Sequence, residues 1–325
     1  MTNLSKYTST DVINSLNPKN KSIFAKIIFF FMQLLVYILM YPILWFISIL
    51  PFRILYIFSD FVCFWVYNVF GYRKSTVRKN LALTLPHLNT KERLAIERKF
   101  YTHMCDMFLE MIKTMNISEA EINRRFVITN IELIKEYENK GKSVVLMCAH
   151  YASWEWLINI AKKINFSSIG IYKKINNKYF DKLIRKIRSK LNAELVETKK
   201  TVELMEYNKK IGLKAFYGFA SDQSPQLYRA KYWDNFMGHE VPVYTGAEML
   251  AKKLDMNMVF VRVQKVKRGF YQATIVPLVD NPRDYPDYEI TSLFLREVEK
   301  QILEAPEYYF WTHKRWKHMC KKPLE

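Results

Sequence analysis

The feature that most constrains this chain is a run of 24 residues without a charge, from Ile27 to Leu50. The run is rich in Ile, Leu, Phe, Tyr and Trp, and it reaches the roughly 20 residues that a helix needs to cross a bilayer. Lys26 and Arg53 close it at both ends, as is common at a membrane interface. A secretory signal has a shorter apolar core of about 7–15 residues. We therefore predict a retained membrane-anchoring helix, with a buried core helix as the alternative.

A second apolar segment, residues 54–70, carries Asp60 in its middle. One carboxylate makes it a poor membrane span but an acceptable interfacial helix. Lysines and arginines lie on both sides of the two segments, so their distribution does not choose between spanning the membrane and dipping into one leaflet. The chain then divides into four predicted parts: a polar tail (1–20), a membrane-anchoring segment (21–72), a helical segment (73–130) and an α/β domain (131–325).

Residues 89–115 have the pattern of an amphipathic helix. Asn89 and Glu92 are spaced as a capping box, and Ser118 is placed to cap a second, short helix. A methionine-rich apolar stripe follows at helical spacing. We expect this stripe to be core, although methionine also adapts to the irregular shape of a lipid-chain groove. His103 lies on the same helix and has no partner at metal-ligand spacing, so we interpret it as a satisfied polar neighbour.

From about residue 131 the pattern changes to alternating strands and helices. The predicted strands are "SVVLMCA", "KAFYGFAS", "MNMVFVRVQKV" and "FYQATIVPL". The predicted helices cover residues 178–191, 200–210 and 245–254. Helices between the early strands imply crossovers and a largely parallel sheet, whereas the last two strands read as a hairpin. Ligands of such sheets gather at the carboxyl ends of the strands, where His150 and Asp222 lie.

His150 directly follows the first of these strands, and Glu155 comes five residues later. A histidine at a strand end can have its pKa moved through neutrality by small environmental shifts, which suits a general base. With Ser153 as N-cap, Glu155 falls in the first turn of the next helix, where its carboxylate could orient the imidazole. The alternative is a capping acid beside an unrelated histidine. Cys148 is a remote candidate nucleophile, because a cysteine at a strand end usually serves packing.

Eight cations and one acid lie between Lys173 and Lys190, and Arg185 and Arg188 share one face of the predicted helix. Guanidinium groups suit phosphate, so next to a membrane segment this cluster indicates a lipid headgroup contact, with a solvated helix face as the alternative. The tail "YYFWTHKRWKH" repeats aromatics with Lys314, Arg315 and Lys317. Similar interleaving occurs in proteins that bind single-stranded nucleic acid, but no nucleic-acid motif accompanies it here.

The net charge of +19 also indicates an anionic partner. The four cysteines form neither a CxxC pair nor a zinc pattern, and GxxxxGK[ST], GxGxxG and GxSxG are absent from the sequence. We therefore expect no metal, no nucleotide cofactor and no nucleic-acid partner. What remains is direct group transfer with a histidine base.

Several elements in order carry a family resemblance: His150 and Glu155 after an apolar strand, then "SDQSP", "YWDNFMGHEVPVYTGAEMLAKK" and "WTHKRWK". Together they resemble the lipid A late acyltransferases, and through them the mycobacterial phosphatidylinositol mannoside acyltransferases. The likeness covers nearly the whole chain, from the anchor to the tail. One departure is Ala152-Ser153, where members of the family commonly have Gly-Asn before Trp-Glu.

The resemblance implies a mixed, largely parallel sheet like that of glycerol-3-phosphate acyltransferase, flanked by helices. It further implies an inner-membrane enzyme facing the cytoplasm, which moves a fatty acyl chain from acyl carrier protein to a hydroxyl of a phosphorylated glycolipid. His150 would be the base and Glu155 its helper, while the expected substrate-binding residues are Arg185, Arg188, Asp222, Gln223 and Gly246. Two alternatives stay open: a 3-hydroxyacyl aminolipid as acceptor, and a non-catalytic membrane protein that binds lipids.

Overall fold

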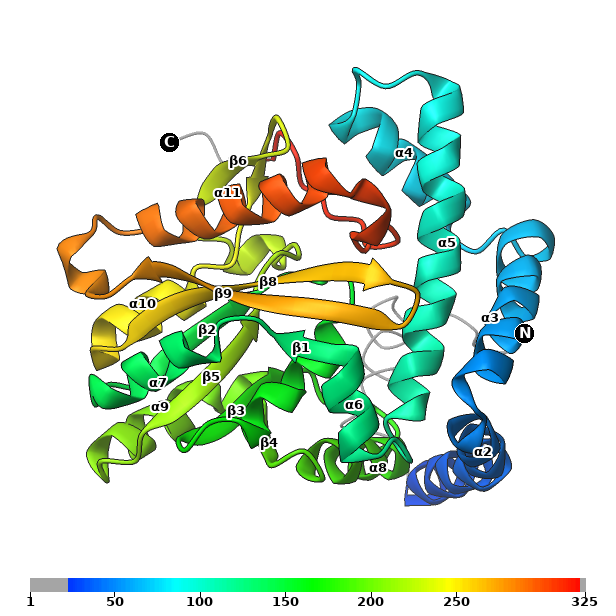
Figure 1. Ribbon diagram of the computed structural model, residues 1–325, viewed down its shortest axis with the longest axis horizontal. Helices are drawn as coiled ribbons and strands as arrows, with labels where there is room; N and C mark the ends of the chain where they lie inside the picture. Colours follow the sequence, from blue (N-terminus) through cyan, green and yellow to red (C-terminus); the bar gives the residue numbers. More distant parts are fainter. Residues whose placement is uncertain (1–22, 322–325) are drawn as a thin grey trace, which may run out of the picture.

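The computed structural model describes residues 23–321, which form a mixed sheet flanked by helices, with two apolar helices at one end of the molecule (Figure 1). This is the predicted α/β class. The expected polar tail at residues 1–20 lies outside the described residues.

The two apolar segments form separate helices. The first is α2 (Ile23–Ile49), and the second is α3 (Phe52–Phe64), which a π-helical turn extends through Trp65–Val69. Ile28–Ile49 and Phe52–Val69 are long and apolar enough to cross a membrane, yet only 6% and 11% of these stretches are buried within the chain. The buried-core alternative is therefore wrong for α2, because most of its apolar side chains from Ile28 onward are exposed.

A helical layer links these two helices to the sheet. It consists of α4 (Lys74–Thr84), α5 (Thr90–Lys113) and α6 (Glu119–Arg125), and α5 packs against both α2 and α3 (Figure 1). The predicted capping box is confirmed, because Asn89 and Glu92 exchange hydrogen bonds at the start of α5. Phe100, Met104 and Met107 are buried, so most of the predicted stripe is core, although Phe108 is exposed. The cap at Ser118 is also confirmed, since its side chain accepts a hydrogen bond from the Glu121 backbone.

The main sheet has seven strands in the order β1-β9-β8-β2-β5-β3-β4. All neighbours run parallel except β8 and β9, which form the predicted antiparallel hairpin. The central strand β2 is buried along its whole length, as expected for a strand of a parallel sheet covered on both faces. The bounds of the strands are β1 (Phe126–Ile128), β2 (Val144–Cys148), β3 (Ser167–Tyr172), β4 (Ala193–Glu197), β5 (Ala215–Ala220), β8 (Asn257–Lys267) and β9 (Phe270–Val279).

The sequence pattern missed three strands of this sheet and one small hairpin. Strand β1 closes the segment that was predicted to be helical. Strands β3 and β4 contain Ser, Gly and Glu, and β4 lies at the sheet edge, so neither strand presents a continuous apolar run. The hairpin of β6 (Trp233–Phe236) and β7 (His239–Pro242) stands apart from the sheet.

The predicted helices are present with nearly the expected bounds. They are α8 (Lys178–Ser189), α9 (Thr201–Lys210) and α10 (Gly246–Leu254). Two more helices, α7 (Ile131–Asn139) and α11 (Glu289–Glu304), complete the flanking layers. After α11 a short turn, η7 (Pro306–Tyr308), returns the chain toward the end of β2. This return places the C-terminal segment beside the strand ends where ligands of parallel sheets bind.

Candidate active site

The carboxyl ends of β2 and β5 lie side by side, with Cys148 paired to Ala220. Two residues beyond each strand end, the chain presents His150 and Asp222, and the structure brings the two together. The Nδ1 of His150 lies 2.7 Å from Oδ1 of Asp222, and the backbone N–H of His150 donates to the same oxygen at 3.1 Å. An ionised carboxylate only accepts hydrogen bonds, so Nδ1 carries a proton and Nε2 of the neutral ring is left to accept one.

Burial and charge act in opposite directions on this pair. Burial lowers the pKa of His150, but the charge of Asp222, its hydrogen bond and the more distant Glu155 outweigh burial, and the pKa rises above its usual value. Burial raises the pKa of Asp222, yet the charge and hydrogen bonds of His150 bring it below the usual range. Asp222 is 1% exposed and His150 is 21% exposed. The imidazole of His150 is therefore more basic than a free one, and part of it is open to a ligand.

The C-terminal segment holds the histidine turn in place. The backbone N–H of Phe310 donates to the carbonyl of His150, and that of Ala152 donates to the carbonyl of Tyr308. Ala152 has φ +49, in the left-handed region that glycine adopts at no steric cost. Alanine therefore stands here in a backbone conformation that favours glycine.

Glu155 does not occupy the place expected of it. Its Oε2 accepts a hydrogen bond from Nη2 of Arg188 at 2.6 Å, while Asp222 holds the imidazole. The segment after Ser153 is a 3₁₀ helix, η3 (Trp154–Lys162), and Ser153 makes no side-chain cap. In this geometry the carboxylate meets the last turn of α8, where the guanidinium neutralises it. Glu155 thus influences His150 only through its charge.

An apolar pocket of about 140 Å³ opens beside this ion pair. Trp154, Glu155 and Arg188 lie along its lining together with Cys148. The rest of the lining is mainly aliphatic and aromatic, and includes Leu157, Ile158, Ile160, Ile169, Ile171, Leu195 and Phe216. A pocket with two charged side chains and an otherwise apolar wall suits a hydrocarbon chain that ends in a polar group.

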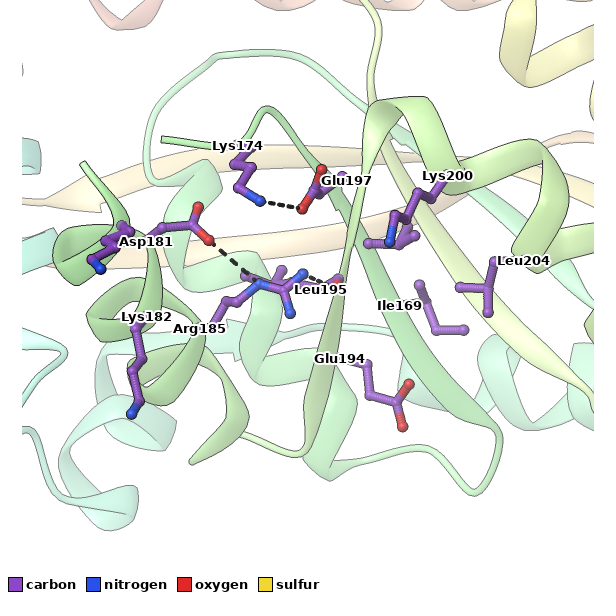
Figure 2. A pocket seen from close by; sticks show the side chains of 12 residues that line it. Ile169, Lys174, Asp181, Lys182, Arg185, Glu194, Leu195, Glu197, Lys200 and Leu204 are labelled. Atoms are coloured by element: carbon purple, nitrogen blue, oxygen red, sulfur yellow. Dashed lines mark hydrogen bonds and ion pairs between the residues drawn. The ribbon is translucent and has the colours of Figure 1, made fainter. Parts of the chain in front are cut away.

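The two arginines of α8 lie at different pockets. Arg188 lines the apolar pocket, whereas Arg185 lines a second, polar pocket between α8 and β4 (Figure 2). Arg185 donates to the hydroxyl of Tyr172 at 2.8 Å and to the carbonyl of Leu195 at 3.2 Å. The two arginines of the predicted cluster therefore line two different pockets.

The two remaining predicted residues, Gln223 and Gly246, make no side-chain contact with His150 or Asp222 among the hydrogen bonds and ion pairs of the described residues. Gln223 is half-buried directly after Asp222. Gly246 begins α10, and open space surrounds the position that a Cβ would take there. The Tyr244 hydroxyl donates to the Ser224 carbonyl at 3.4 Å, which ties the segment before α10 to the loop after Asp222.

Three residues of the site were missed, although they lie in the quoted tail. Tyr309 and Arg315 are buried near Asp222, and Arg315 donates to the Pro242 carbonyl. His313 Nε2 accepts a hydrogen bond from the Ser224 backbone, and burial with the nearby cations lowers its pKa to about 4. Arg315 is fully buried with Trp311, so this cation of the tail is not part of a surface contact. Aromatics and cations can alternate in a buried segment as well as in a surface contact, so the sequence pattern alone does not distinguish the two.

Cys148 is poorly suited to attack a substrate. Burial, reinforced by the charges of Asp222 and Glu155, raises the pKa of its thiol to about 12. A thiol in this state is protonated at neutral pH, and only the thiolate is a strong nucleophile. Among residues 23–321, no group of three or more His, Cys, Asp and Glu side chains is arranged to hold a metal ion.

Comparison with known proteins decides the family. The family model described as bacterial lipid A biosynthesis acyltransferase matches residues 27–318. The chain belongs to this family. The lipid A biosynthesis lauroyltransferase of Escherichia coli K12 is 24% identical over 279 residues, which cover 85% of this chain and 89% of that protein. The lipid A biosynthesis palmitoleoyltransferase of the same organism is 22% identical over 247 residues, covering 75% and 79%.

A third relative is a lipid A biosynthesis acyltransferase from Haemophilus influenzae, 23% identical over 247 residues, with 75% of this chain and 78% of that protein covered. The match to the lipid A acyltransferase family includes the apolar helices, the His150 turn and the C-terminal segment. The family to which this chain belongs carries out acyl transfer in lipid A biosynthesis.

Proposed function

We propose that this chain transfers a fatty acyl group from acyl carrier protein to a hydroxyl of a lipid A precursor, with His150 as the general base. The observation that carries the proposal is the 2.7 Å contact of His150 with buried Asp222, beside an apolar pocket. Family membership supplies the reaction class.

The reaction needs no covalent enzyme intermediate. Nε2 of His150 takes the proton of the acceptor hydroxyl, and the oxygen attacks the carbonyl carbon of the thioester. The tetrahedral intermediate then breaks its C–S bond, and the leaving thiolate takes the proton back from the imidazolium. Asp222 stabilises the imidazolium during this sequence, because a buried carboxylate at 2.7 Å favours the charged ring.

Glu155 and Arg188 would act at the mouth of the apolar pocket. Arg188 neutralises Glu155 and has further N–H donors that the contact at 2.6 Å does not use. We propose that these donors, with backbone N–H groups at the start of η3, stabilise negative charge on the thioester carbonyl. The acyl chain would lie along the aliphatic wall formed by β3, β5 and η3.

The anchor helices and the charge balance support the proposed location and donor. The exposed apolar surfaces of α2 and α3 fit a membrane, and we propose the inner membrane with the α/β domain on the cytoplasmic side. Acyl carrier protein and phosphorylated glycolipids are both acidic, and the net charge of +19 would attract them. A 3-hydroxyacyl aminolipid remains a second candidate acceptor.

The test is acyl transfer by the full chain in membranes, with labelled lauroyl groups offered on acyl carrier protein or on coenzyme A. The acceptors are lipid A precursor and a 3-hydroxyacyl aminolipid. We expect transfer from the carrier protein to lipid A precursor, a loss of about 10³-fold in His150→Gln, and unchanged activity in His87→Gln, which alters an exposed histidine. Equal activity of His150→Gln and the native chain would reject the base and favour a lipid-binding protein without catalysis.

A second variant tests the acyl pocket. A Cβ on Gly218, which lines this pocket, would meet its nearest neighbours at ordinary contact distances of 3.9 Å and 4.0 Å. Gly218→Ala therefore adds a methyl group to the wall without a backbone clash. We expect the variant to favour shorter acyl chains than the native protein does, whereas an unchanged chain-length profile would place the acyl chain elsewhere.

A further inference from the structure

A second pocket, of about 460 Å³, lies between α8, β4 and the turn before α9 (Figure 2). This volume is in the range of small-ligand sites. Ile169 and Leu195 line both this pocket and the apolar one, so the two are separated by only a thin wall. Unlike the apolar pocket, this one is lined by cations: Lys174, Lys178, Lys182, Arg185 and Lys200.

The charges of this pocket are only partly compensated. Its carboxylates are Asp181, Glu194 and Glu197. Glu197 accepts a hydrogen bond from Lys174 at 3.0 Å, and Asp181 lies 3.7 Å from Arg185. Two pairs therefore cancel, which leaves three lysines against one carboxylate and an excess of positive charge.

Two of these lysines are free to take a ligand. Within residues 23–321, the side chains of Lys182 and Lys200 have no hydrogen-bond or ion-pair partner, and both residues are exposed. Glu194, on β4, is also exposed, and its side chain is unpaired in the same part of the chain. Ammonium groups bind phosphate oxygens, and a free carboxylate accepts hydrogen bonds from hydroxyl groups. Together they suit a phosphorylated group that also carries hydroxyls.

The pocket lies next to the first membrane helix. Gln33 of α2 donates to the Asn176 carbonyl at 3.1 Å, and its own carbonyl accepts from Asn177 at 3.0 Å. Lys178, at the pocket, stands 3.8 Å from the ring centre of Phe30, also in α2. These contacts fix α8 against a helix whose outer surface is apolar, so the pocket opens where a lipid headgroup would lie.

We propose that this pocket binds the phosphorylated, hydroxyl-bearing headgroup of the acceptor lipid. The assignment to the acceptor rests on the proposed function, whereas the binding chemistry does not. Lys182 and Lys200 would hold the phosphate, and Glu194 would accept hydrogen bonds from the sugar. Because the apolar pocket shares a wall with this one, a lipid held here by its headgroup keeps the rest of its length within reach of His150.

Binding is tested first, without catalysis. The full chain in detergent at low salt is titrated calorimetrically with glucosamine 1-phosphate and with glucosamine. We expect the native chain to bind the phosphosugar more tightly, and the double variant Lys182→Gln/Lys200→Gln to weaken that binding about tenfold. The control is Lys135→Gln/Lys210→Gln, which removes two exposed lysines outside the pocket and should bind as the native chain does.

Transfer kinetics and vesicle binding then identify the source of the phosphate. With lipid A precursor, the pocket variant should raise KM about tenfold at unchanged kcat, and it should lose the preference for acceptor that retains its phosphates. Equal phosphosugar affinity in the pocket and control variants would overturn the proposal. So would a selective loss of binding to phosphatidylglycerol vesicles at unchanged KM, because the pocket would then hold bulk anionic lipid.

Failure of the proposed function would look different. A native chain that transfers no acyl group but binds glucosamine 1-phosphate through Lys182 and Lys200 would refute the transferase and keep the headgroup pocket. A chain that transfers acyl groups with the same KM in all variants would keep the transferase and refute the pocket.

Discussion

Two histidines of this chain, the partly exposed His150 and the buried His103, have surroundings of opposite charge. His150 faces the carboxylate of Asp222, and its pKa is raised despite burial. His103 is buried at 3% exposure with Nδ1 at 3.2 Å from Nζ of Lys265, and burial and that cation hold its pKa well below the usual value. The surroundings of His150 thus favour its charged form, whereas those of His103 favour the neutral form. The expectation that His103 is a satisfied polar neighbour is met at Nδ1 only, since Nε2 has no partner among the described residues.

The surroundings of the two histidines differ in the same way. His103 adjoins a charge cluster formed by Asp60, Asp106, Glu110, Lys265 and Arg268, which we call the anchor cluster. It joins α3 and α5 to the hairpin of β8 and β9. None of its residues lines either of the two described pockets. The charges of the anchor cluster thus lie apart from both pockets, whereas the pair of His150 and Asp222 lies beside the apolar pocket.

The largest expected effect separates the two histidines directly. His150→Gln should lower acyl transfer about 10³-fold and leave the melting temperature nearly unchanged, because Asp222 keeps a hydrogen-bonding neighbour. His103→Gln should leave kcat unchanged and alter only the melting temperature. Transfer assays and thermal unfolding of both variants test this pair. A loss of kcat in His103→Gln that equals the loss in His150→Gln would remove the distinction.

The anchor cluster should respond to substitution with a loss of stability. Asp106 accepts hydrogen bonds from Ser59 at 2.8 Å and from Arg268 at 2.7 Å and 2.9 Å. Asp106→Ala removes the acceptor of Ser59 and the ion-pair partner of the buried Lys265, while Arg268 keeps Asp60, and it should cost about 3 kcal/mol in the free energy of unfolding. Urea unfolding measures the cost, and Asp234→Ala is a comparison outside the cluster. If Asp106→Ala kept its stability but lost activity, the anchor cluster would have a role in catalysis rather than in stability.

The ion pair of Glu155 and Arg188 should act as a unit. We expect Glu155→Gln and Arg188→Gln each to lower kcat about 10²-fold, with the double variant close to either single one. The reason is that each side chain positions the other at the pocket mouth through the 2.6 Å contact. Steady-state kinetics of the three variants test it. Fully additive losses would show that the two residues act separately.

A smaller effect concerns the pH dependence of stability. Burial, with the charge of Asp106, raises the pKa of Glu110 from 4.5 to about 7, although Tyr271 donates a hydrogen bond to it. Between these values the folded protein keeps a proton that the unfolded chain has released, so stability falls as pH rises from about 5 to 7.

Glu110→Gln should remove that slope, which we estimate at about 1–2 kcal/mol over the window. The measurement is urea unfolding of the variant and the native chain at pH 5 and pH 8. Glu132→Gln, which changes an exposed residue, is the control. A slope that persists in Glu110→Gln would assign the proton to another group of the anchor cluster.

Much of this fold could be predicted from periodicity, and part of the site could not. The apolar runs of β2, β5, β8 and β9 and the caps of α5 and α6 are local signals, and they were found as expected. Strands β3 and β4 are held by their neighbours rather than by their own composition, so the pattern does not show them.

The site was predictable where it depends on topology alone. His150 and Asp222 end neighbouring parallel strands, so their proximity follows from the sheet. The partner of Glu155 depends on the pitch of η3 and on the position of α8, which no local pattern contains. The burial of Arg315 likewise depends on the C-terminal segment returning to the strand ends.

The most direct test of the central claim is the pH dependence of kcat/KM for the native chain and for Asp222→Asn. A base must be unprotonated to act, so the native rate should fall as pH falls through the raised pKa of His150. Asp222→Asn removes the charge that raises this pKa. We therefore predict that the variant has a lower maximum of kcat/KM, and that its kcat/KM falls off at a lower pH than that of the native chain. If kcat/KM fell at the same pH in both proteins, the result would contradict the pairing of His150 with Asp222 as the catalytic base.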